Sequence, residues 1–212
     1  MKNIFIILTI LLYSCKTEIV TNSYNASFST EKQKVKSKAK APIVKSNTVF
    51  YFVRHAETVG DGKIVNPDLS ITGRARAEKW VTYFKEKKID SIFTTNFKRT
   101  LQTIIPVAKS KGITPIYYNP SDIDYANFIK QNKGKNILIV GHSNTTPNFV
   151  NKLIGSMKYS QMVDENHSDI FKVIVGNNNN AVEEVFVLEE ELAKIAAVQA
   201  KLDKKNKKRK KK

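Results

Sequence analysis

The stretch VFYFVRHAET, residues 49–58, places an uninterrupted apolar run directly before an arginine and a histidine. The β-branched and aromatic residues of this run predict a strand over 47–53 that is buried on both faces, as in a parallel sheet. A polar side chain at the end of a buried strand costs free energy unless it has a partner. His55 is therefore the first candidate functional residue.

A second stretch repeats this pattern. NILIVGH, residues 136–142, is an apolar strand that ends on His142, and TTNFKRTLQT, residues 94–103, carries Arg99 just past another predicted strand. Ligands of open α/β sheets collect at the carboxyl ends of the strands. We therefore expect these side chains to converge on one edge of the sheet.

Apolar runs and helical periodicity alternate along the body of the chain, which predicts an α/β fold. We expect a three-layer α/β/α sandwich with a mainly parallel sheet and a C-terminal antiparallel hairpin. The predicted strands are 47–53, 91–95, 114–118, 136–142, 170–175 and 183–189. The predicted helices are 72–88, capped by Thr72, 97–111, ending at Gly112, 121–132, capped by Ser121 or Asp122, and 146–154.

The converging residue types suit a phosphate. The planar fork of an arginine binds tetrahedral oxyanions in bidentate fashion. A neutral imidazole beside it can attack phosphorus and form a covalent intermediate. Two arginines, Arg54 and Arg99, and two histidines, His55 and His142, would supply both functions.

Three motifs together resemble the signatures of the histidine phosphatase superfamily, in the branch of the phosphoglycerate mutases and small bacterial phosphatases. They are FVRHAET, Arg99 within KRTLQT, and VGHSNTTP, and their order and spacing match over residues 47–190. The resemblance implies a phosphatase that hydrolyses phosphomonoesters or phosphoamidates through a phosphohistidine. It implies a phosphorylated small molecule or phosphoprotein as substrate, and neither a metal nor another cofactor.

The resemblance also assigns roles to residues. His55 is the nucleophile, and Arg54, Arg99 and His142 form the phosphate pocket, to which Asn144 adds a further donor. His142 is expected to act as a protonated donor to the transition state. His55 is expected to be deprotonated at the attacking nitrogen, with its other nitrogen bonded to a backbone carbonyl.

The acid that protonates the leaving group is the least defined part of the site. In the family it follows the third strand, where this chain reads YYNPSDIDYANF, residues 117–128. Asp122 and Asp124 are the carboxylates there, and we assign the role to Asp122, although either can instead cap a helix. The Glu-containing motif of the mutases is absent from this stretch. Its absence favours a simple phosphatase whose leaving group needs little protonation, such as a phosphohistidine.

Other prominent residues receive structural interpretations. His167 lies in the polar stretch DENHSD, where we expect it to be exposed and inert. Trp80, Phe84 and Phe97 are expected to pack in the core or between helices. Gly73 is expected where a helix approaches a loop closely. No pair of histidines has the short spacing of a zinc site, and the arginines beside two of them would repel a cation.

The net charge of +17 belongs to the ends of the chain. Residues 31–45 hold six Lys against one Glu, and residues 201–212 hold nine Lys or Arg against one Asp, whereas residues 46–200 carry a net charge of only +3. Such runs are either solvated and disordered or bind polyanions such as lipid head groups. The nearly neutral body argues against specific nucleic-acid binding.

The first fifteen residues, MKNIFIILTILLYSC, have the charged start and short apolar run of a secretory signal. LYSC resembles a bacterial lipoprotein signal with Cys15 as the lipidated residue; the alternative is a generic signal cleaved elsewhere. We expect attachment to the bacterial cell envelope through this lipid, facing the periplasm or the exterior. The expected organisation is a signal (1–15), a flexible Lys-rich spacer (16–45), the phosphatase-like domain (46–190) and a helical to disordered Lys-rich tail (191–212). The alternative function is a non-catalytic envelope lipoprotein that binds phosphate or polyanions.

Overall fold

The computed structural model describes residues 47–60, 64–176, 178 and 181–209. Contacts divide the chain into two units, Met1–Pro42 and Ile43–Lys212, and all described residues lie in the second. The predicted signal, the lipidation site at Cys15 and the spacer fall outside the described residues.

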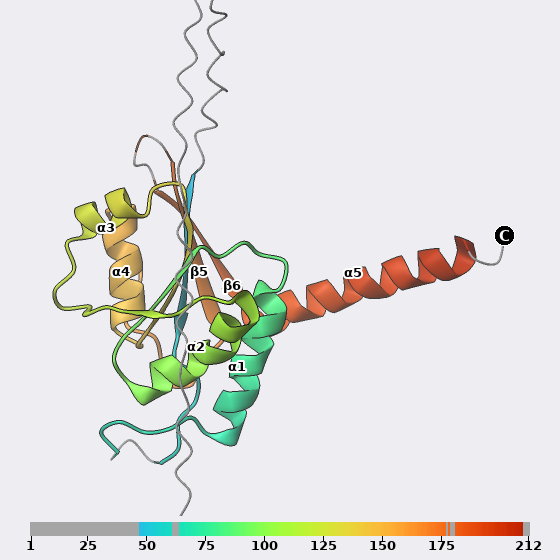
Figure 1. Ribbon diagram of the computed structural model, residues 1–212, viewed down its shortest axis with the longest axis horizontal. Coiled ribbons are helices and arrows are strands. Elements are labelled where there is room, and N and C mark those ends of the chain that lie inside the picture. Colours follow the sequence, from blue (N-terminus) through green and yellow to red (C-terminus); the bar gives the residue numbers. More distant parts are fainter. Residues whose placement is uncertain (1–46, 61–63, 177, 179–180, 210–212) are drawn as a thin grey trace, which may run out of the picture. The chain divides into compact units, whose positions relative to one another are not determined.

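The second unit contains a six-stranded sheet in the order β3-β2-β4-β1-β5-β6 (Figure 1). The four strands β3, β2, β4 and β1 are parallel to their neighbours, whereas β5 is antiparallel to both β1 and β6. The expected parallel sheet with a C-terminal antiparallel hairpin is confirmed. The strands are β1 (Thr48–Arg54), β2 (Ser91–Thr94), β3 (Ile116–Tyr117), β4 (Asn136–Gly141), β5 (Asp169–Val175) and β6 (Ala181–Val187).

Helices cover both faces of this sheet, which makes three layers (Figure 1). Helices α1 and α2 pack on one face, and α3 and α4 pack on the other. The helices are α1 (Ile71–Phe84), α2 (Lys98–Lys111), α3 (Tyr125–Gln131), α4 (Thr145–Ile154) and α5 (Leu188–Arg209). Helix α5 continues directly from β6, so the domain border expected at residue 190 falls inside one helix.

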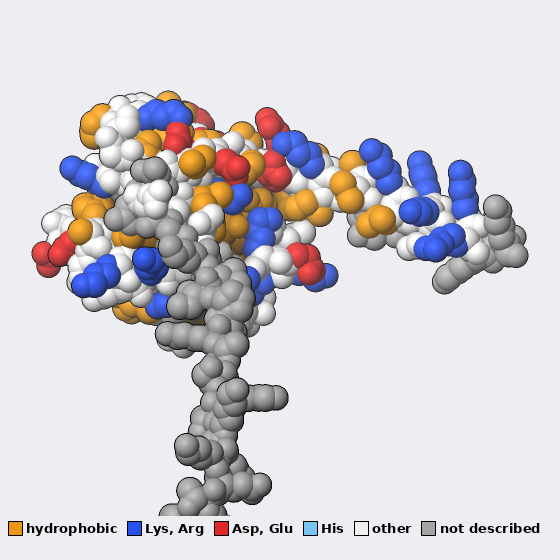
Figure 2. Space-filling view, turned by 90° about the horizontal axis from the view of Figure 1, so that it is seen from above, with side chains coloured by type: hydrophobic (Ala, Val, Ile, Leu, Met, Phe, Trp, Pro, Cys, Tyr) orange, Lys and Arg blue, Asp and Glu red, His pale blue; other side chains and the backbone are white. Residues whose placement is uncertain are grey.

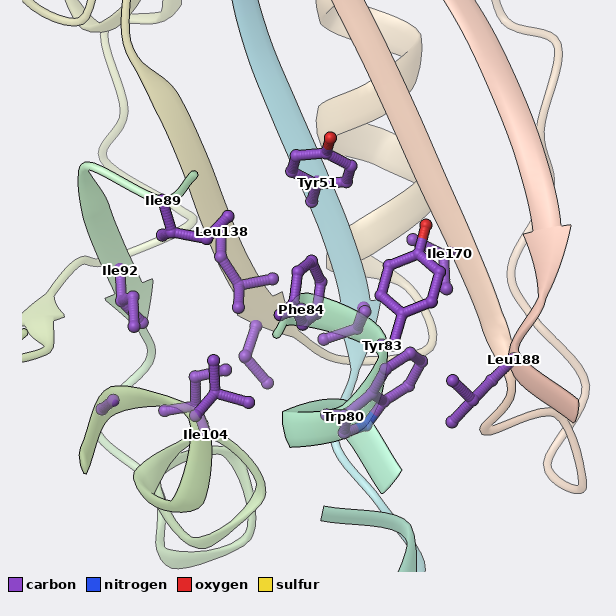
Figure 3. Packing of buried hydrophobic residues seen from close by; sticks show 14 residues of the cluster. Tyr51, Trp80, Tyr83, Phe84, Ile89, Ile92, Ile104, Leu138, Ile170 and Leu188 are labelled. Carbon is purple, nitrogen blue, oxygen red and sulfur yellow. The ribbon is translucent and has the colours of Figure 1, made fainter. Parts of the chain in front are cut away.

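The two apolar cores follow from the alternation of side chains along β1. Tyr51 and Val53 of β1 face the layer formed by α1 and α2. There they pack with Trp80 and Phe84 of α1, which are both fully buried (Figure 3). The side chains that alternate with these along β1 point to the opposite face of the sheet and pack on α4. Because a strand covered on both faces must be apolar at every position, the continuous apolar run of β1 is explained.

Two helix starts differ from those predicted. Ser70 rather than Thr72 caps α1, since its hydroxyl accepts a hydrogen bond from the Gly73 N–H at 3.0 Å. Asp124, and not Ser121 or Asp122, caps α3 by accepting from the Asn127 N–H. Both errors arise because several consecutive residues can act as caps, and the local sequence does not choose between them. Gly112 ends α2 in the left-handed conformation, as expected.

Among the described residues, no helix combines the length and the apolar character needed to span a bilayer.

Gly73 lies in the first turn of α1, against the loop that follows His55. A Cβ at this position would lie 2.1 Å from the carbonyl oxygen of Glu57. That carbonyl is held in place because it accepts a hydrogen bond from the Ser70 N–H at 2.9 Å. Helix and loop therefore approach so closely that only glycine fits, as expected from the sequence.

Replacing Gly73 by Ala should destabilise the fold by about 1–3 kcal/mol, although Ala is the better helix former by about 1 kcal/mol. The added methyl group would push the α1 start away from the loop. Urea unfolding measures the change. Ala75→Gly, at an exposed position of the same helix, reports the propensity effect alone. A Gly73→Ala protein as stable as the parent would contradict the close approach.

Candidate active site

The register of β1 and β4 brings two histidines together. The strands are parallel, and Arg54 pairs with Gly141. His55 and His142 therefore leave the sheet side by side, with ring centroids 5.5 Å apart. The pairing continues one residue beyond β1, because the His55 N–H donates to the Gly141 carbonyl at 3.0 Å.

Arg54 is a buried guanidinium with unused hydrogen-bonding capacity. Its side chain is only 7% exposed, and its NH1 group donates to three backbone carbonyls, those of Val163, Asp164 and Asn166, at 2.7, 3.0 and 3.2 Å. Its Nε is buried and has no hydrogen-bond partner among the described residues. A buried cation is costly, and an oxyanion bound beside the guanidinium would offset that cost with its negative charge.

Arg99 stands at the start of α2 next to His142. Its NH2 group lies 3.2 Å from Nδ1 of His142, and its guanidinium lies over the ring of Phe97 at 4.4 Å. Phe97 also meets the His142 ring edge to face, with centroids 5.1 Å apart. Phe97 is 38% exposed, so the expectation that it is a packing residue is only partly right. It forms an apolar wall beside both groups.

His142 is neutral in this site, with its proton on Nε2. Nδ1 accepts from Arg99, which has no acceptor atom, and Nε2 lies 2.9 Å from the Thr95 hydroxyl. Burial lowers the pKa of His142 to about 4, and the charges of Arg99 and Arg54 act in the same direction. The role expected from the sequence, a protonated donor to the transition state, concerns the site with an anion bound and stays a prediction. An anion held between the arginines would favour protonation.

His55 is neutral as well, but with the opposite tautomer. Its Nδ1 donates to the Ala56 carbonyl at 2.9 Å, which is the backbone bond expected from the sequence, so Nε2 carries a free lone pair. Burial lowers the pKa of His55 to about 3 despite that hydrogen bond, and the nearby Arg54 adds to the shift. The form present at neutral pH is the one that a nucleophile requires.

The prediction that His167 is exposed is wrong. The side chain is buried, and its Nδ1 lies 2.7 Å from the His55 carbonyl, 112 residues away in the chain. The ring centroids of His167 and His55 are 5.7 Å apart. Burial lowers the pKa of His167 and outweighs the hydrogen bond to His55. A polar sequence context indicated a surface loop, whereas that loop folds back over the site.

The loop after His55 is held by a partly exposed ion-pair cluster. Arg76 on α1 binds the Glu57 carboxylate with Nε and NH2, and NH2 lies 2.7 Å from Oε1. The same guanidinium donates to the Ser168 hydroxyl at 2.8 Å and to Glu189 at the start of α5. It therefore ties together α1, the loop after β1 and the residue that follows His167.

The remaining predicted site residues are less closely connected. Asn144 caps α4, since its side-chain oxygen accepts from the Thr145 N–H at 2.8 Å. Asp122 is exposed before α3, and the described structure shows no contact between its side chain and the two arginines and two histidines. The carboxylate of Asp164, by contrast, lies 3.7 Å from Arg54 and is 92% exposed. The role of Asp122 stays a prediction.

The described residues contain no group of three or more His, Cys, Asp or Glu side chains that could hold a metal ion. The two guanidinium groups instead give the site a positive potential, and the two imidazoles beside them are neutral. Such a site has the groups that can bind a tetrahedral anion and offer it a free imidazole nitrogen as a nucleophile.

Sequence reasoning located the four central residues and missed those that orient them. The residues that contact the four central ones are Thr95, Thr103, Asp164 and His167. Both threonines belong to the TTNFKRTLQT motif that also carries Arg99: Thr95 directly follows β2, and Thr103 lies one helical turn after Arg99 on α2. Their place in this motif was a usable signal. Asp164 and His167 come from a segment far along the chain with no recognisable pattern.

Residues 50–121 of the chain match the sequence model of a protein family, the histidine phosphatase superfamily (branch 1). In structure the chain is similar to the protein histidine phosphatase SixA complexed with tungstate, at 15% identity and a TM-score of 0.56, over 67% of this chain and 98% of that chain. It is also similar to a phosphoglycerate mutase from Bacillus anthracis str. Sterne, at 13% identity and a TM-score of 0.53, over 67% of this chain and 93% of that chain. A third similar structure is a phosphoserine phosphatase mutant from Entamoeba histolytica in complex with phosphoserine, at 18% identity and a TM-score of 0.51, over 64% of this chain and 94% of that chain. A comparison with curated protein sequences found no match.

In the protein without ligand, neither His55 nor His142 should titrate between about pH 5.5 and 8, because both pKa values lie well below the ordinary value of about 6.5. NMR of the imidazole resonances measures this. Tungstate should move the His142 titration upward, since an adjacent dianion favours the imidazolium. A pKa near the ordinary value of about 6.5 for either ring in the free protein would contradict the described electrostatics. The His55→Asn variant assigns the resonances, because the His55 signals are missing from its spectrum.

Proposed function

We propose that this chain, which belongs to the histidine phosphatase superfamily, hydrolyses phosphomonoesters or phosphoamidates through a phosphohistidine on His55. One observation carries the proposal. A neutral His55 with a free Nε2 stands beside a buried Arg54 whose Nε has no partner in the described part of the chain. A phosphoryl group bound there would meet the positive charge of Arg54 and the nucleophile together.

The reaction has two displacements. In the first, the lone pair of His55 Nε2 forms a bond to phosphorus while the bond from phosphorus to the leaving oxygen or nitrogen breaks. The leaving atom keeps that electron pair and takes up a proton. In the second, water attacks phosphorus, the P–N bond returns its pair to Nε2, and phosphate and a proton are released.

The surrounding cations stabilise the phosphoryl oxygens. Arg54 and Arg99 supply fixed positive charge, and His142 becomes a donor if it takes up a proton when the anion binds. His142 is held for this role by its bond to Thr95, whose hydroxyl lies 3.0 Å from that of Thr100. None of these groups requires a metal, and we propose a metal-independent enzyme.

A weakly placed acid favours certain leaving groups. Asp122 is the proposed proton donor from the family pattern, and Asp164 is the carboxylate near Arg54. Neither contacts His55 in the described structure. A phosphoamidate, whose nitrogen is easily protonated, needs less help from such an acid than an alkyl phosphate does. We therefore propose phosphoamidates, including a protein phosphohistidine, as the preferred substrate class.

His55→Ala should lower turnover of p-nitrophenyl phosphate and phosphoramidate by at least about 10³-fold, because no other group replaces the nucleophile. Tungstate affinity should change by less than about tenfold, since Arg54 and Arg99 remain. Acid-labile, base-stable label should appear on the parent protein and not on the variant. EDTA should leave the parent activity unchanged.

Two outcomes would contradict the proposal. Full turnover in a folded His55→Ala protein would exclude the mechanism. Tungstate binding without turnover of any substrate would select the alternative function, a non-catalytic lipoprotein that binds phosphate.

We also propose attachment to the cell envelope by a lipid on Cys15, with the C-terminal tail touching polyanionic lipid. The support for Cys15 is the LYSC motif alone. The support for the tail contact comes from the helix itself, because α5 exposes basic side chains beside apolar ones (Figure 2). Ile195, Val198 and Leu202 are exposed and recur at helical spacing. A basic helix with an apolar stripe suits an anionic bilayer surface better than a nucleic acid.

Residues 16–212 should bind phosphatidylglycerol vesicles at least about tenfold more tightly than residues 16–194, and the difference should shrink as salt rises. Co-sedimentation measures this, with phosphatidylcholine vesicles as the control. The shortened chain keeps Glu189 and its ion pair to Arg76, so its turnover should be unchanged. Equal binding by the two chains would exclude the tail contact.

A further inference from the structure

Each backbone polar group of His55 and Ala56 has a partner. The His55 N–H donates to Gly141 at 3.0 Å, and the His55 carbonyl lies 2.7 Å from Nδ1 of His167. The Ala56 N–H donates to the Thr103 hydroxyl at 2.8 Å, and the Ala56 carbonyl accepts from Nδ1 of His55 at 2.9 Å. Four hydrogen bonds therefore hold the backbone at the nucleophile.

Two of these bonds hold a single peptide unit from opposite sides. The carbonyl of His55 and the N–H of Ala56 belong to the same planar group. His167 binds its oxygen, and Thr103 binds its nitrogen. Because the plane is rigid, these two contacts fix where the Cα of Ala56 lies, and the φ and ψ angles of Ala56 direct its carbonyl from there toward Nδ1 of His55.

The direction of the Ala56 carbonyl matters because it accepts the Nδ1 proton of His55. That bond fixes both the ring orientation and the tautomer that leaves Nε2 free. If the peptide unit rotated, the Ala56 carbonyl would move away from Nδ1. The proton could then shift to Nε2, which would no longer be a nucleophile.

We propose that His167 is a positioning residue, which, with Thr103, orients the His55–Ala56 peptide unit and so keeps His55 in its reactive tautomer. The inference rests on the proposed role of His55 as the nucleophile. His167 acts through a neutral Nδ1–H donor, since a carbonyl can only accept.

His167 can do this because its own segment is fixed. Arg54 donates to the carbonyls on either side of residue 165, at Asp164 and Asn166. The Ser168 hydroxyl accepts from Arg76, and its carbonyl accepts from the Leu188 N–H at 2.8 Å. One short segment therefore serves the phosphate-binding arginine and the nucleophile together.

A merely structural role for His167 is the competing explanation. It predicts that loss of stability accompanies any loss of activity and that the chemical nature of the replacement is unimportant. The positioning role predicts that a side chain with an N–H at the place of Nδ1 restores function. Asn is such a side chain, whereas Leu matches the size and lacks the donor.

The test compares His167→Leu with His167→Asn in the full chain, with p-nitrophenyl phosphate as substrate. His167→Leu should lower kcat by about 10- to 100-fold, as expected when a reacting group is displaced by a fraction of an ångström. His167→Asn should stay within about fivefold of the parent. The dissociation constant of tungstate should change by less than about threefold in both, since the arginines that hold the anion remain.

Thr103 supplies an independent variant of the same contact. Thr103→Val should reproduce the loss in kcat, and Thr103→Ser, which keeps the hydroxyl, should not. In the double variant Thr103→Val with His167→Leu, kcat should fall by less than the product of the two single-variant factors, because both substitutions act on one peptide unit. Fully multiplicative losses would indicate separate effects and overturn the proposal.

Nitrogen-15 NMR of the His55 ring provides a readout that does not depend on turnover. The parent and His167→Asn should show a protonated Nδ1 and a bare Nε2, whereas His167→Leu should show a mixture of tautomers. An unchanged His55 tautomer in a folded His167→Leu protein overturns the positioning role. If the parent lacks turnover but the tautomers behave as expected, the proposed function fails and the positioning role survives.

Discussion

Six consecutive residue pairs join β1 to β4, from Val49 opposite Asn136 to Arg54 opposite Gly141. This parallel register is the constraint on which the site depends. A slip of one residue would shift one histidine by about 3.3 Å along the sheet and turn alternate side chains to the other face. The apolar cores on both sheet faces oppose such a slip, because it would bring different side chains into each core.

Burial has opposite consequences for the two residue types at this edge. An imidazole responds to burial and to nearby arginines by losing its proton, so His55 and His142 are both neutral. A guanidinium keeps its charge, so Arg54 stays a buried cation whose Nε is unpaired within the described chain. The result is a site that combines positive charge with a nucleophile. Phosphate is the guest that such a combination suits.

The segment before β5 completes the site from the far end of the chain. Its carbonyls hold the NH1 group of Arg54, and His167 holds the backbone of His55. Arg76 links the same segment to the loop after His55 and to the start of α5. These bonds explain how a polar stretch without an apolar pattern can be rigid, since its polar groups are satisfied internally.

The amino-acid sequence determined the layered α/β fold, because apolar runs and helical periodicity are local properties that each strand and helix carries by itself. It also determined that Arg54, His55, Arg99 and His142 follow strands and so meet at one edge. The caps of α1 and α3 were predicted wrongly, since neighbouring residues can cap equally well.

Only the tertiary structure decided the charge state of His142 and the burial of His167. Both depend on burial and on partners more than 40 residues away along the chain. A pattern read along the chain contains no information on such long-range contacts, which is why the residues that orient the nucleophile appeared only once the chain was folded.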